Sequence, residues 1–429
     1  MASEGIGPSA VRPGTGPTTL ADMSGWRVLT ALAGAALIGS PPAVPPSATP
    51  VFVPCPYVAQ PRPVPPQPSP PARDPARPVL GGPGLATAGL TVPAGVPTPP
   101  AVSATAWLVA DLDTGEVLGA CGPHEQHRPA SVQKLLLAET MLPRLDPTQV
   151  VEVTPDDLNI DPGSSAVGVL PGGRYTVETL WLGLLLESGN DTANVLARLG
   201  GGDAGLAGGI AAMNAEAHRL GADDTHAVSS SGLDRPGQFT SAYDLALIAR
   251  ADFARDDFRR YDTALRAQIP PQPPKDPRGF QIQNENQLLT RYPGALGGKT
   301  GFTDQARHTY VGAAQRNGRR LVVTLLGAEA FPVRGWQQGA ALLDWGFGLP
   351  ADASVGHLVT PDEVDRLRNP PTPRPASKAP VFQRAMGGGP GTGALGLAMA
   401  VAAVPLLVIA ALCPRLIRRA ARRRGLPLR

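Results

Sequence analysis

Ser131 and Lys134 are the residues of this 429-residue chain whose types and spacing first point to chemistry. They stand three positions apart in the stretch RPASVQKLLLA, residues 128–138. Residues at i and i+3 of a helix share a face, so the lysine amine would lie beside the serine hydroxyl. A serine is a weak nucleophile that needs a base. A lysine with a lowered pKa can be that base, whereas arginine never gives up its proton in a protein.

Lysine is rare in this chain, which strengthens the hypothesis that Lys134 has a chemical role. Only four of the 38 basic residues are lysines, and the other 34 are arginines. The S-x-x-K spacing is also common by chance, and a solvated helix lysine is the alternative interpretation. The motif therefore needs support from elsewhere in the chain.

Two later stretches supply that support. Lys299 and Thr300 stand in GGKTGF, where a cation and a hydroxyl beside a strand favour a carboxylate-binding site; a plain turn is the alternative. In Ser188-Gly189-Asn190 the serine could pass a proton to a leaving amine, while Asn190 could bind a peptide carbonyl and hold Lys134. A helix-breaking loop is the alternative there. The S-x-N motif follows Ser131 by 57 residues and K-T-G follows after another 111, and the three motifs in this order are far more specific than any one alone.

The elements that must position these motifs are strands and helices in a mixed order. Strand-like runs and a DTG turn predict a hairpin near the start of the body, and strand-like runs return near its end. Apolar periodicity predicts helices between them and one after them. This order predicts an α+β fold. The expected strands are 104–110, 116–120, 307–313 and 320–327, and the expected helices are 131–142, 181–190, 192–199, 210–220, 241–250 and 337–345.

The set of motifs resembles the D-alanyl-D-alanine carboxypeptidases, which are low-molecular-mass penicillin-binding proteins and serine peptidases of the S-x-x-K, S-x-N and K-T-G superfamily. The resemblance covers roughly residues 104–347. Besides the three motifs it includes the segments SGNDTAN, SGLD, NENQLL, GGKTGFT and LLDWGF. It implies a DD-peptidase/β-lactamase-like fold: a mainly antiparallel sheet flanked by helices, with an inserted helical subdomain.

The resemblance also implies roles for particular residues. Ser131 would be the nucleophile, Lys134 its base and Ser188 the proton relay. The backbone N–H groups of Ser131 and Phe302 would bind the oxyanion, and no metal or other cofactor would be needed. The substrate-binding residues implied are Asn190, Lys299, Thr300, Gly301 and Phe302. The expected substrates are peptidoglycan stem peptides ending in D-Ala-D-Ala, with β-lactams acting as covalent inhibitors.

Two departures from the family pattern and three rival functions accompany this hypothesis. Ala306-Arg307 stands where the family often has Ala-Gly, and the β-rich C-terminal domain of many relatives is missing. A class A β-lactamase would need S-D-N and a deacylating glutamate loop before K-T-G, which the chain lacks. A non-catalytic wall-binding protein would not need Lys134. The sequence does not decide between hydrolysis and DD-transpeptidation.

The ends of the chain predict a membrane-anchored, secreted protein. Residues 394–413 are twenty residues without a charge, enough to cross a bilayer core as a helix. Seven arginines follow at once, which predicts a cytoplasmic tail and a catalytic body on the outer, cell-wall side. Without them the chain has 31 basic and 35 acidic residues, a net charge of −4, so binding to nucleic acid is not expected. The apolar run 28–39 predicts a secretion signal, whose true start could be Met23.

These patterns divide the chain into six expected parts. Residues 41–100 contain 21 prolines and are expected to form a disordered spacer. Cys55 and Cys121 could pair, although Cys55 lies in that spacer. His124 and His127 have a metal-ligand spacing but no accompanying cluster, so a solvated loop is favoured over zinc. The parts are a signal region (1–40), the spacer (41–100), the catalytic domain (101–365), a Pro/Gly-rich linker (366–393), a transmembrane helix (394–413) and an Arg-rich tail (414–429).

Overall fold

The computed structural model describes residues 52–59 and 78–370. Its main feature is an antiparallel sheet of seven strands in the order β1-β3-β2-β10-β9-β8, with β11 paired to β3. Two smaller hairpins, β4–β5 and β6–β7, lie outside this sheet. The strands are β1 (Leu90–Thr91), β2 (Ala106–Asp111), β3 (Glu116–Cys121), β4 (Val150–Glu152), β5 (Arg174–Thr176), β6 (Arg266–Ile269), β7 (Phe280–Gln283), β8 (Ala295–Thr303), β9 (Arg307–Arg316), β10 (Arg319–Ala328) and β11 (Gly356–His357).

Seven α-helices, α1 to α7, occupy the chain between β3 and β8, and they form the expected helical insertion. The helices of the described part are α1 (Lys134–Met141), α2 (Val177–Leu186), α3 (Asn190–Gly200), α4 (Gly205–Leu220), α5 (Ala242–Ala254), α6 (Asp256–Asp262), α7 (Leu288–Arg291), α8 (Gly335–Phe347) and α9 (Pro361–Arg368). Short 3-10 helices are η1 (Pro83–Leu85), η2 (Ala130–Gln133), η3 (Leu142–Arg144), η4 (Pro155–Leu158) and η5 (Gly202–Ala204). The predicted α+β fold is confirmed.

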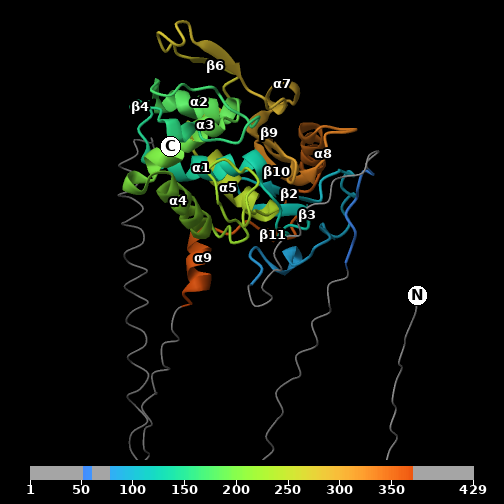
Figure 1. The fold of residues 1–429 in the computed structure, drawn as a ribbon. Coiled ribbons are helices and arrows are strands. Elements are labelled where there is room, and N and C mark those ends of the chain that lie inside the picture. The colour runs from blue at the N-terminus through green and yellow to red at the C-terminus, as the bar shows by residue number, and fades with distance from the viewer. Residues whose placement is uncertain (1–51, 60–77, 371–429) are drawn as a thin grey trace, which may run out of the picture. The chain divides into compact units, whose positions relative to one another are not determined.

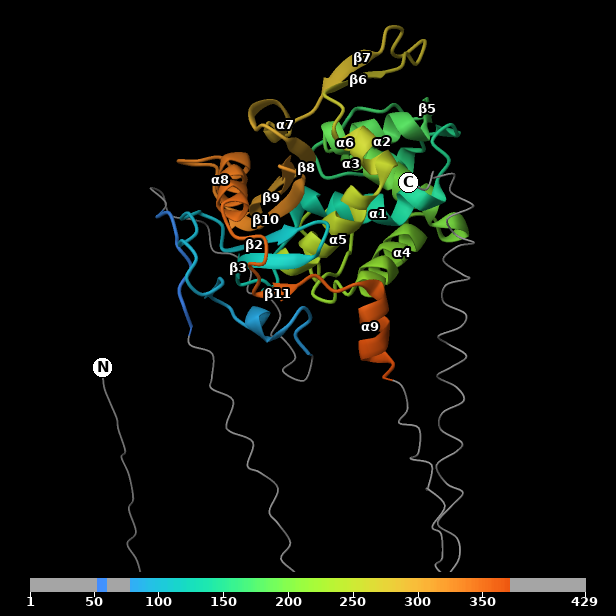
Figure 2. The same ribbon diagram turned by 180° about the vertical axis from the view of Figure 1, so that it is seen from behind.

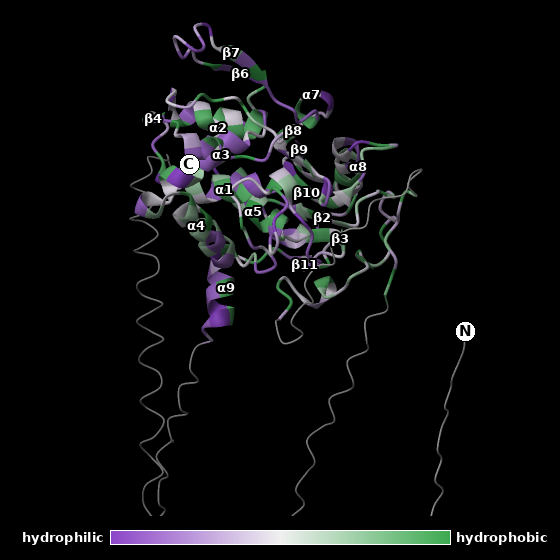
Figure 3. Cartoon of the chain, in the orientation of Figure 1, coloured by the Kyte–Doolittle hydropathy of each residue, from purple (hydrophilic) through white to green (hydrophobic). Residues whose placement is uncertain are grey.

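The sheet lies between α8 on one face and helices of the α1 to α5 group on the other (Figure 1), and an apolar core cluster fills each interface. Along β2, Trp107 and Val109 belong to the core cluster that contains α8, whereas Leu108 and Ala110 belong to the cluster that contains α1 to α5. This alternation follows from the two-residue period of a strand. Because both faces are covered, every residue of β2 is buried. Apolar residues are accordingly frequent in the sheet and in α2, while α9 is mostly hydrophilic (Figure 3).

Local sequence signals explain where several elements begin and turn. At the β2–β3 hairpin, Asp111 Oδ1 accepts hydrogen bonds from the backbone N–H groups of Asp113 and Thr114, at 2.9 and 3.1 Å. Gly115 then takes a φ of 82°, which glycine adopts without steric penalty. The helix α5 is capped by Ser241, whose hydroxyl accepts from the Asp244 N–H, a role for which serine is well suited.

The β6–β7 hairpin is an element that the sequence analysis missed. It projects beyond α2 in both views of the fold (Figures 1 and 2). Of the eight residues in its two strands, only Ile269 and Ile282 are buried. An almost entirely solvated hairpin carries little of the apolar alternation by which strands are recognised in a sequence.

The prediction of a disordered spacer over residues 41–100 is wrong for the parts that the structure describes. Leu85 is fully buried in the core, and β1 pairs with β3. Cys55 forms a disulfide with Cys121 on β3, and Tyr57 forms a β-bridge with Val102. Proline-rich composition did not prevent this segment from packing, because a disulfide and a two-residue strand hold it against the sheet.

Much of the chain's expected topology lies outside the described residues. This holds for the signal region, the predicted membrane helix over 394–413, the arginine-rich tail and nearly all of the linker. Within residues 52–59 and 78–370, no helix is both long and apolar enough to cross a membrane. The chain divides into two compact units, 1–365 and 366–429, and the second contributes only the end of α9 and two following residues to the described part.

Candidate active site

Ser131 stands on the 3-10 helix η2, directly before α1. The residue before it, Ala130, has a φ of 49°, a left-handed conformation that is uncommon for a non-glycine residue. The hydroxyl of Thr309 on β9 donates to the carbonyl of Pro129 at 2.8 Å and ties this turn to the sheet. Strained backbone of this kind persists where the surrounding structure holds it, often at functional sites. The turn presents Ser131 to a cavity at the edge of the sheet.

Lys134 lies beneath Ser131 and is fully buried. Its Nζ is 2.9 Å from Ser131 Oγ, which confirms that the S-x-x-K spacing brings the two groups together. The same Nζ is 2.7 Å from Asn190 Oδ1, 3.2 Å from the Ser231 carbonyl oxygen and 3.5 Å from Ser188 Oγ. The S-x-x-K motif and the S-x-N loop therefore meet at the side-chain nitrogen of Lys134.

The contacts of Lys134 suit a neutral amine. A neutral amine has two hydrogens and one lone pair. The Asn190 Oδ1 and the Ser231 carbonyl can only accept hydrogen bonds, so they take the two hydrogens. The lone pair is then left for the hydroxyl hydrogen of Ser131. Burial, followed by the nearby Lys299 cation, lowers the pKa of Lys134 well below its usual value. The arrangement can therefore take a proton from Ser131.

The S-x-N loop connects α2 to α3 and is tightly constrained. Ser188 has a φ of 61° and is buried, and Asn190 begins α3. A Cβ on Gly189 would lie 2.6–2.7 Å from side-chain atoms of its neighbours, which explains the glycine between the two polar residues. The carboxylate of Asp191 accepts from the N–H groups of residues 167–169 and so fixes the loop that faces Ser188. The two side chains of the motif are thereby held toward Lys134.

Lys299 is placed differently from the sequence expectation. It lies on β8 and is buried, and its Nζ donates to the Thr300 carbonyl at 2.9 Å. It is not among the residues that line the cavity at Ser131. Burial lowers its pKa to about 8, while the charges of Glu285 and Asp262 oppose that change. On this geometry its cation acts on Lys134, and Thr300 and Gly301 are the members of the K-T-G motif that line the cavity.

Asp262, at the end of α6, is a supporting residue that the sequence analysis missed. It is fully buried, and its Oδ2 accepts from the Gly298 N–H at 2.6 Å. A Cβ on Gly297 would come within 1.9 Å of that oxygen, so the double glycine before Lys299 makes room for the carboxylate. Burial raises the pKa of Asp262 to about 7, against the lowering effects of that hydrogen bond and of Lys299. Only a deeply buried position distinguishes this aspartate from the others, and burial is invisible in a single sequence.

Gly301 and Phe302 complete the β8 side of the site. A Cβ on Gly301 would lie 2.8 Å from the backbone nitrogen of Ser131, so glycine lets the strand approach the nucleophile closely. Phe302 is 49% exposed, and its ring lies against the ring of His308, with centroids 4.6 Å apart. Thr300, Gly301 and Phe302 all line the cavity. The structure thus brings seven of the eight predicted site residues to the cavity or to Lys134, and it places Lys299 beneath it.

Arg307, the departure from the usual glycine, has a structural explanation. Its φ is 57°, in the left-handed region that favours glycine. The guanidinium forms two hydrogen bonds to Glu329, at 2.8 and 3.0 Å, and lies 5.4 Å from the centre of the Phe302 ring. A bidentate pair of this kind offsets a left-handed residue, which costs about 1–2 kcal/mol. The substitution therefore leaves the site intact.

Two cavities meet at β8. The first has a volume of about 630 Å³ and opens on Ser131, Ser188 and Asn190. The second, of about 660 Å³, extends toward α8 and is lined by Arg334 and Trp336. Glu285, Thr300, Gly301 and His308 line both cavities. Arg334 is a cation at the groove that the sequence analysis did not single out, because an isolated arginine in an arginine-rich chain carries no signal.

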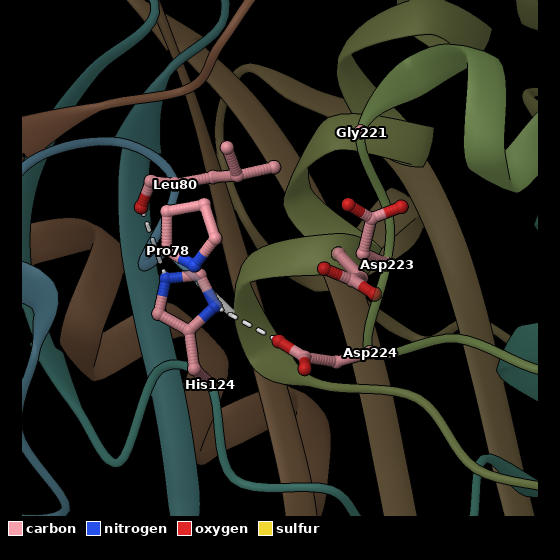
Figure 4. A pocket seen from close by; sticks show the side chains of 7 residues that line it. Pro78, Leu80, His124, Gly221, Asp223 and Asp224 are labelled. Carbon is pink, nitrogen blue, oxygen red and sulfur yellow. Dashed lines mark hydrogen bonds and ion pairs between the residues drawn. The ribbon is translucent and has the colours of Figure 1, made fainter. Parts of the chain in front are cut away.

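The two histidines with metal-ligand spacing do not form a solvated loop. His124 Nδ1 donates to Asp224 at 2.9 Å, and its Nε2 lies 3.1 Å from the Leu80 carbonyl (Figure 4). His124, Asp224 and Asp244 are buried with possible ligand atoms within 4.8 Å of one another, but His127 is not part of that group. Both nitrogens of His124 have a partner, and the contact with the Leu80 carbonyl ties that residue to the domain.

His127 is half-buried, and desolvation lowers its pKa to about 4. Its backbone pairs with Thr240 in a β-bridge.

Comparisons with known proteins agree on one family. Residues 94–330 match peptidase S11, described as D-alanyl-D-alanine carboxypeptidase. The D-alanyl-D-alanine carboxypeptidase DacB2 of Mycobacterium tuberculosis is 46% identical over 272 residues, covering 62% of this chain and 90% of that protein. The crystal structure of a D-alanyl-D-alanine carboxypeptidase from the same organism has a TM-score of 0.59 at 44% identity, over 62% of this chain and 100% of that one. The Streptomyces K15 DD-transpeptidase structure has a TM-score of 0.56 at 26% identity, over 59% of this chain and 100% of that one.

Proposed function

The chain belongs to the peptidase S11 family of D-alanyl-D-alanine carboxypeptidases and is a serine carboxypeptidase, and from this premise we propose how its site works. It removes the terminal D-alanine from peptidoglycan stem peptides through an acyl-enzyme on Ser131. The observation that carries the proposal is the set of contacts of Lys134 Nζ with Ser131, Asn190 and the Ser231 carbonyl. These contacts place a base, the Lys134 amine, within hydrogen-bond distance of the nucleophile, the Ser131 hydroxyl.

Acylation follows from these contacts. The Ser131 hydroxyl gives its proton to Lys134 as Oγ attacks the carbonyl between the two D-alanines. The developing oxyanion accepts hydrogen bonds from the backbone N–H groups of Ser131 on η2 and Phe302 on β8, two elements that approach closely at Gly301. The C–N bond then breaks, and the proton passes to the departing amine by way of Ser188, which lies 3.5 Å from Lys134 Nζ. Water afterwards cleaves the ester and releases the shortened peptide.

Substrate binding divides between the two sides of the groove. Asn190 holds the peptide, and Thr300 takes the terminal carboxylate with the charge of Lys299 below it. Arg334, which lines the adjoining cavity together with Thr300, adds a second cation for the carboxylate. Arginine is well suited to this task because its planar fork of donors matches a carboxylate.

Penicillin should label the same serine, which provides the direct test. Intact-mass measurement of a protein that spans residues 52–370 should show one benzylpenicillin adduct, and Ser131→Ala should abolish it. The same protein should release D-alanine from a peptide ending in D-Ala-D-Ala. An adduct on Ser131→Ala, or the absence of any adduct and of D-alanine release, would overturn the proposal. An adduct that hydrolyses within seconds would favour the β-lactamase alternative.

The membrane anchor remains a proposal drawn from residues outside the structure. A secretion signal over 28–39, a single span over 394–413 and seven arginines after it would hold the catalytic domain on the wall side. Protease added to intact cells should release a soluble penicillin-binding fragment and leave a tail-tagged stub. Release only from broken cells would mean the opposite orientation.

A further inference from the structure

A small cavity is separate from the two that meet at β8. It is lined by residues of the segment before η1, of the loop after β3, of the segment that follows α4 and of α5. None of its lining residues belongs to either cavity at β8. Its volume of about 10 Å³ is close to the smallest space that holds one water molecule. The cavity therefore has room for a single water or a single ion.

Three side chains with metal-ligating atoms converge on this cavity. The side chains of His124 and Asp224 are 8% and 6% exposed, and Asp244, on the first turn of α5, is 1% exposed. Each offers one ligand atom, and the three atoms lie within 4.8 Å of one another. Bonds of about 2.0–2.2 Å from zinc to nitrogen and oxygen place the ligand atoms of one ion about 3–4 Å apart. Small side-chain rotations are therefore enough to bring all three onto one ion.

The ring of His124 is oriented like that of a metal ligand. Its Nε2 lies 3.1 Å from the Leu80 carbonyl oxygen, which can only accept a hydrogen bond, so this nitrogen carries a hydrogen. Its Nδ1 points toward the Asp224 carboxylate, at 2.9 Å from Oδ2 (Figure 4). Metal-binding histidines usually donate from one ring nitrogen to a carbonyl or a carboxylate and bind the ion through the other. Without an ion, a proton lies between Nδ1 and Asp224, and a metal ion can take its place.

Asp244 is held in place for the same role. Its Oδ2 accepts from the Thr225 hydroxyl at 2.7 Å, a contact that fixes the orientation of the carboxylate, as hydrogen bonds to metal ligands commonly do. Burial raises the pKa of Asp244 well above its usual value, and the Asp224 carboxylate raises it further, against hydrogen bonds from Thr225 and Ser241. No lysine or arginine is found among the described residues that line the cavity. A protonated His124 would supply one positive charge to this group, whereas a divalent ion supplies two and binds the carboxylates directly.

We propose that His124, Asp224 and Asp244 bind one Zn²⁺ ion. A zinc ion with one nitrogen and two carboxylate ligands completes its tetrahedron with a single small ligand such as water. Ca²⁺ takes about six to eight oxygen ligands and Mg²⁺ about six, and a cavity for one water has no room for such a shell. The ion would join the loop after β3 to the start of α5, and it would fix Leu80 through the His124 ring. Its ligands take no part in the proposed mechanism, so the inference does not depend on the proposed function.

Zinc uptake by the untagged full-length protein tests the site. The protein is stripped with EDTA and dialysed against Zn²⁺, and the bound metal is measured by elemental mass spectrometry. We expect one Zn²⁺ per chain. Because the ion binds the folded protein, zinc should also raise the unfolding temperature, and equal concentrations of Mg²⁺ or Ca²⁺ should not. Both measurements use the parent protein, so they remain decisive where a variant fails to fold.

Two variants locate the bound ion. Asp244→Asn keeps the shape of the side chain but removes its charge, and His124→Gln removes the ring nitrogen, so each should weaken zinc binding by at least about tenfold. The matched controls are His218→Gln, at an exposed histidine of α4, and Asp203→Asn, at an exposed aspartate of η5. Neither residue lines any of the three cavities, so both controls should bind zinc as the parent does. A cooperative thermal transition shows that each variant is folded.

Two results would overturn the zinc site. A parent that takes up no zinc, or whose unfolding temperature zinc leaves unchanged, would leave a protonated His124 as the partner of Asp224. Zinc that binds equally to the parent and to both site variants would be an adventitious ion only, held by exposed side chains elsewhere.

Discussion

Replacing Lys134 with arginine separates the two things that a buried lysine can supply, charge and a removable proton. Arginine keeps the charge but stays protonated, so it has no lone pair for the Ser131 hydroxyl. Lys134 Nζ is the atom that lies 2.9 Å from Ser131 Oγ, and its pKa is lowered by burial and by Lys299. Lys134→Arg removes the base while leaving the other predicted site residues in place.

The expected loss is that of a general base, about 10²- to 10⁴-fold in the rate of acylation by benzylpenicillin. A permanent cation beside Lys299 in a site without solvent would add to that loss. The guanidinium is also larger than the amine, and overpacking of a buried site lowers the free energy of unfolding by about 1–3 kcal/mol. Stopped-flow acylation with a fluorescent penicillin measures the rate, and thermal unfolding measures the stability separately.

Two further variants make the result interpretable. Lys134→Ala removes the base without adding atoms, so it should be as slow as Lys134→Arg if the base is what matters. Lys275→Arg makes the same substitution at an exposed lysine and should acylate at the parental rate. An arginine variant that acylates within about tenfold of the parent, or an alanine variant that does so while arginine does not, would refute the assignment of Lys134 as the base.

Three other perturbations test the electrostatics and the packing around the site. Because the Lys299 cation helps to lower the pKa of Lys134, Lys299→Ala should move the acidic limb of the acylation pH profile to higher pH, whereas Lys299→Arg should leave that limb in place and retain part of the activity. A common shift in both variants would contradict this. Asp252 is buried, neither carboxylate oxygen has a hydrogen-bond partner among the described residues, and its pKa is raised well above the usual value by burial and by neighbouring carboxylates. A raised folded-state pKa means that Asp252 favours folding at low pH and opposes it as the pH rises past the unfolded value near 4. At pH 8, Asp252→Asn should therefore unfold at a higher temperature than the parent, and its free energy of unfolding should be larger by about 1–3 kcal/mol. Both differences should shrink as the pH falls toward 4. Cys55→Ser removes a disulfide that joins cysteines 66 residues apart in the sequence. The loss of this cross-link from the unfolded chain should lower the free energy of unfolding by about 4 kcal/mol. The urea midpoint of the variant should therefore fall and match that of the reduced parent.

The catalytic pair is the part of the site that short-range sequence logic could predict. Ser131 and Lys134 stand three positions apart, and a single helical turn is enough to bring them together whatever the rest of the chain does. The β2–β3 hairpin and the cap of α5 are predictable for the same reason, since a DTG turn and a serine cap act on their immediate neighbours. The distant S-x-N and K-T-G motifs were connected to this pair by the chemistry of their side chains and by the resemblance to a family, because no local rule brings segments so far apart together.

The structure of two segments was not predicted correctly from the sequence, and both are held to the domain by only a few contacts. The proline-rich segment before residue 100 resembles a spacer in composition, yet Leu85 and the Cys55–Cys121 disulfide anchor it to the sheet. The β6–β7 hairpin is hardly buried and so lacks a clear period. Composition and periodicity report how a segment buries itself, and they say little about a segment that is held by a few long-range contacts.

The sequence by itself determined which chemical groups are present, the local turn that joins Ser131 to Lys134, and the alternation of strands and helices that makes the fold α+β. Only the tertiary structure decided that Lys134 is buried, that Lys299 lies beneath the groove, and that the Ser231 carbonyl and Asp262 complete their surroundings. The physical reason is that a pKa depends on desolvation and on charges within a few ångströms. Those neighbours come from α3, β8 and the segment before α5, which are far apart along the chain and meet only when the sheet and the helices pack.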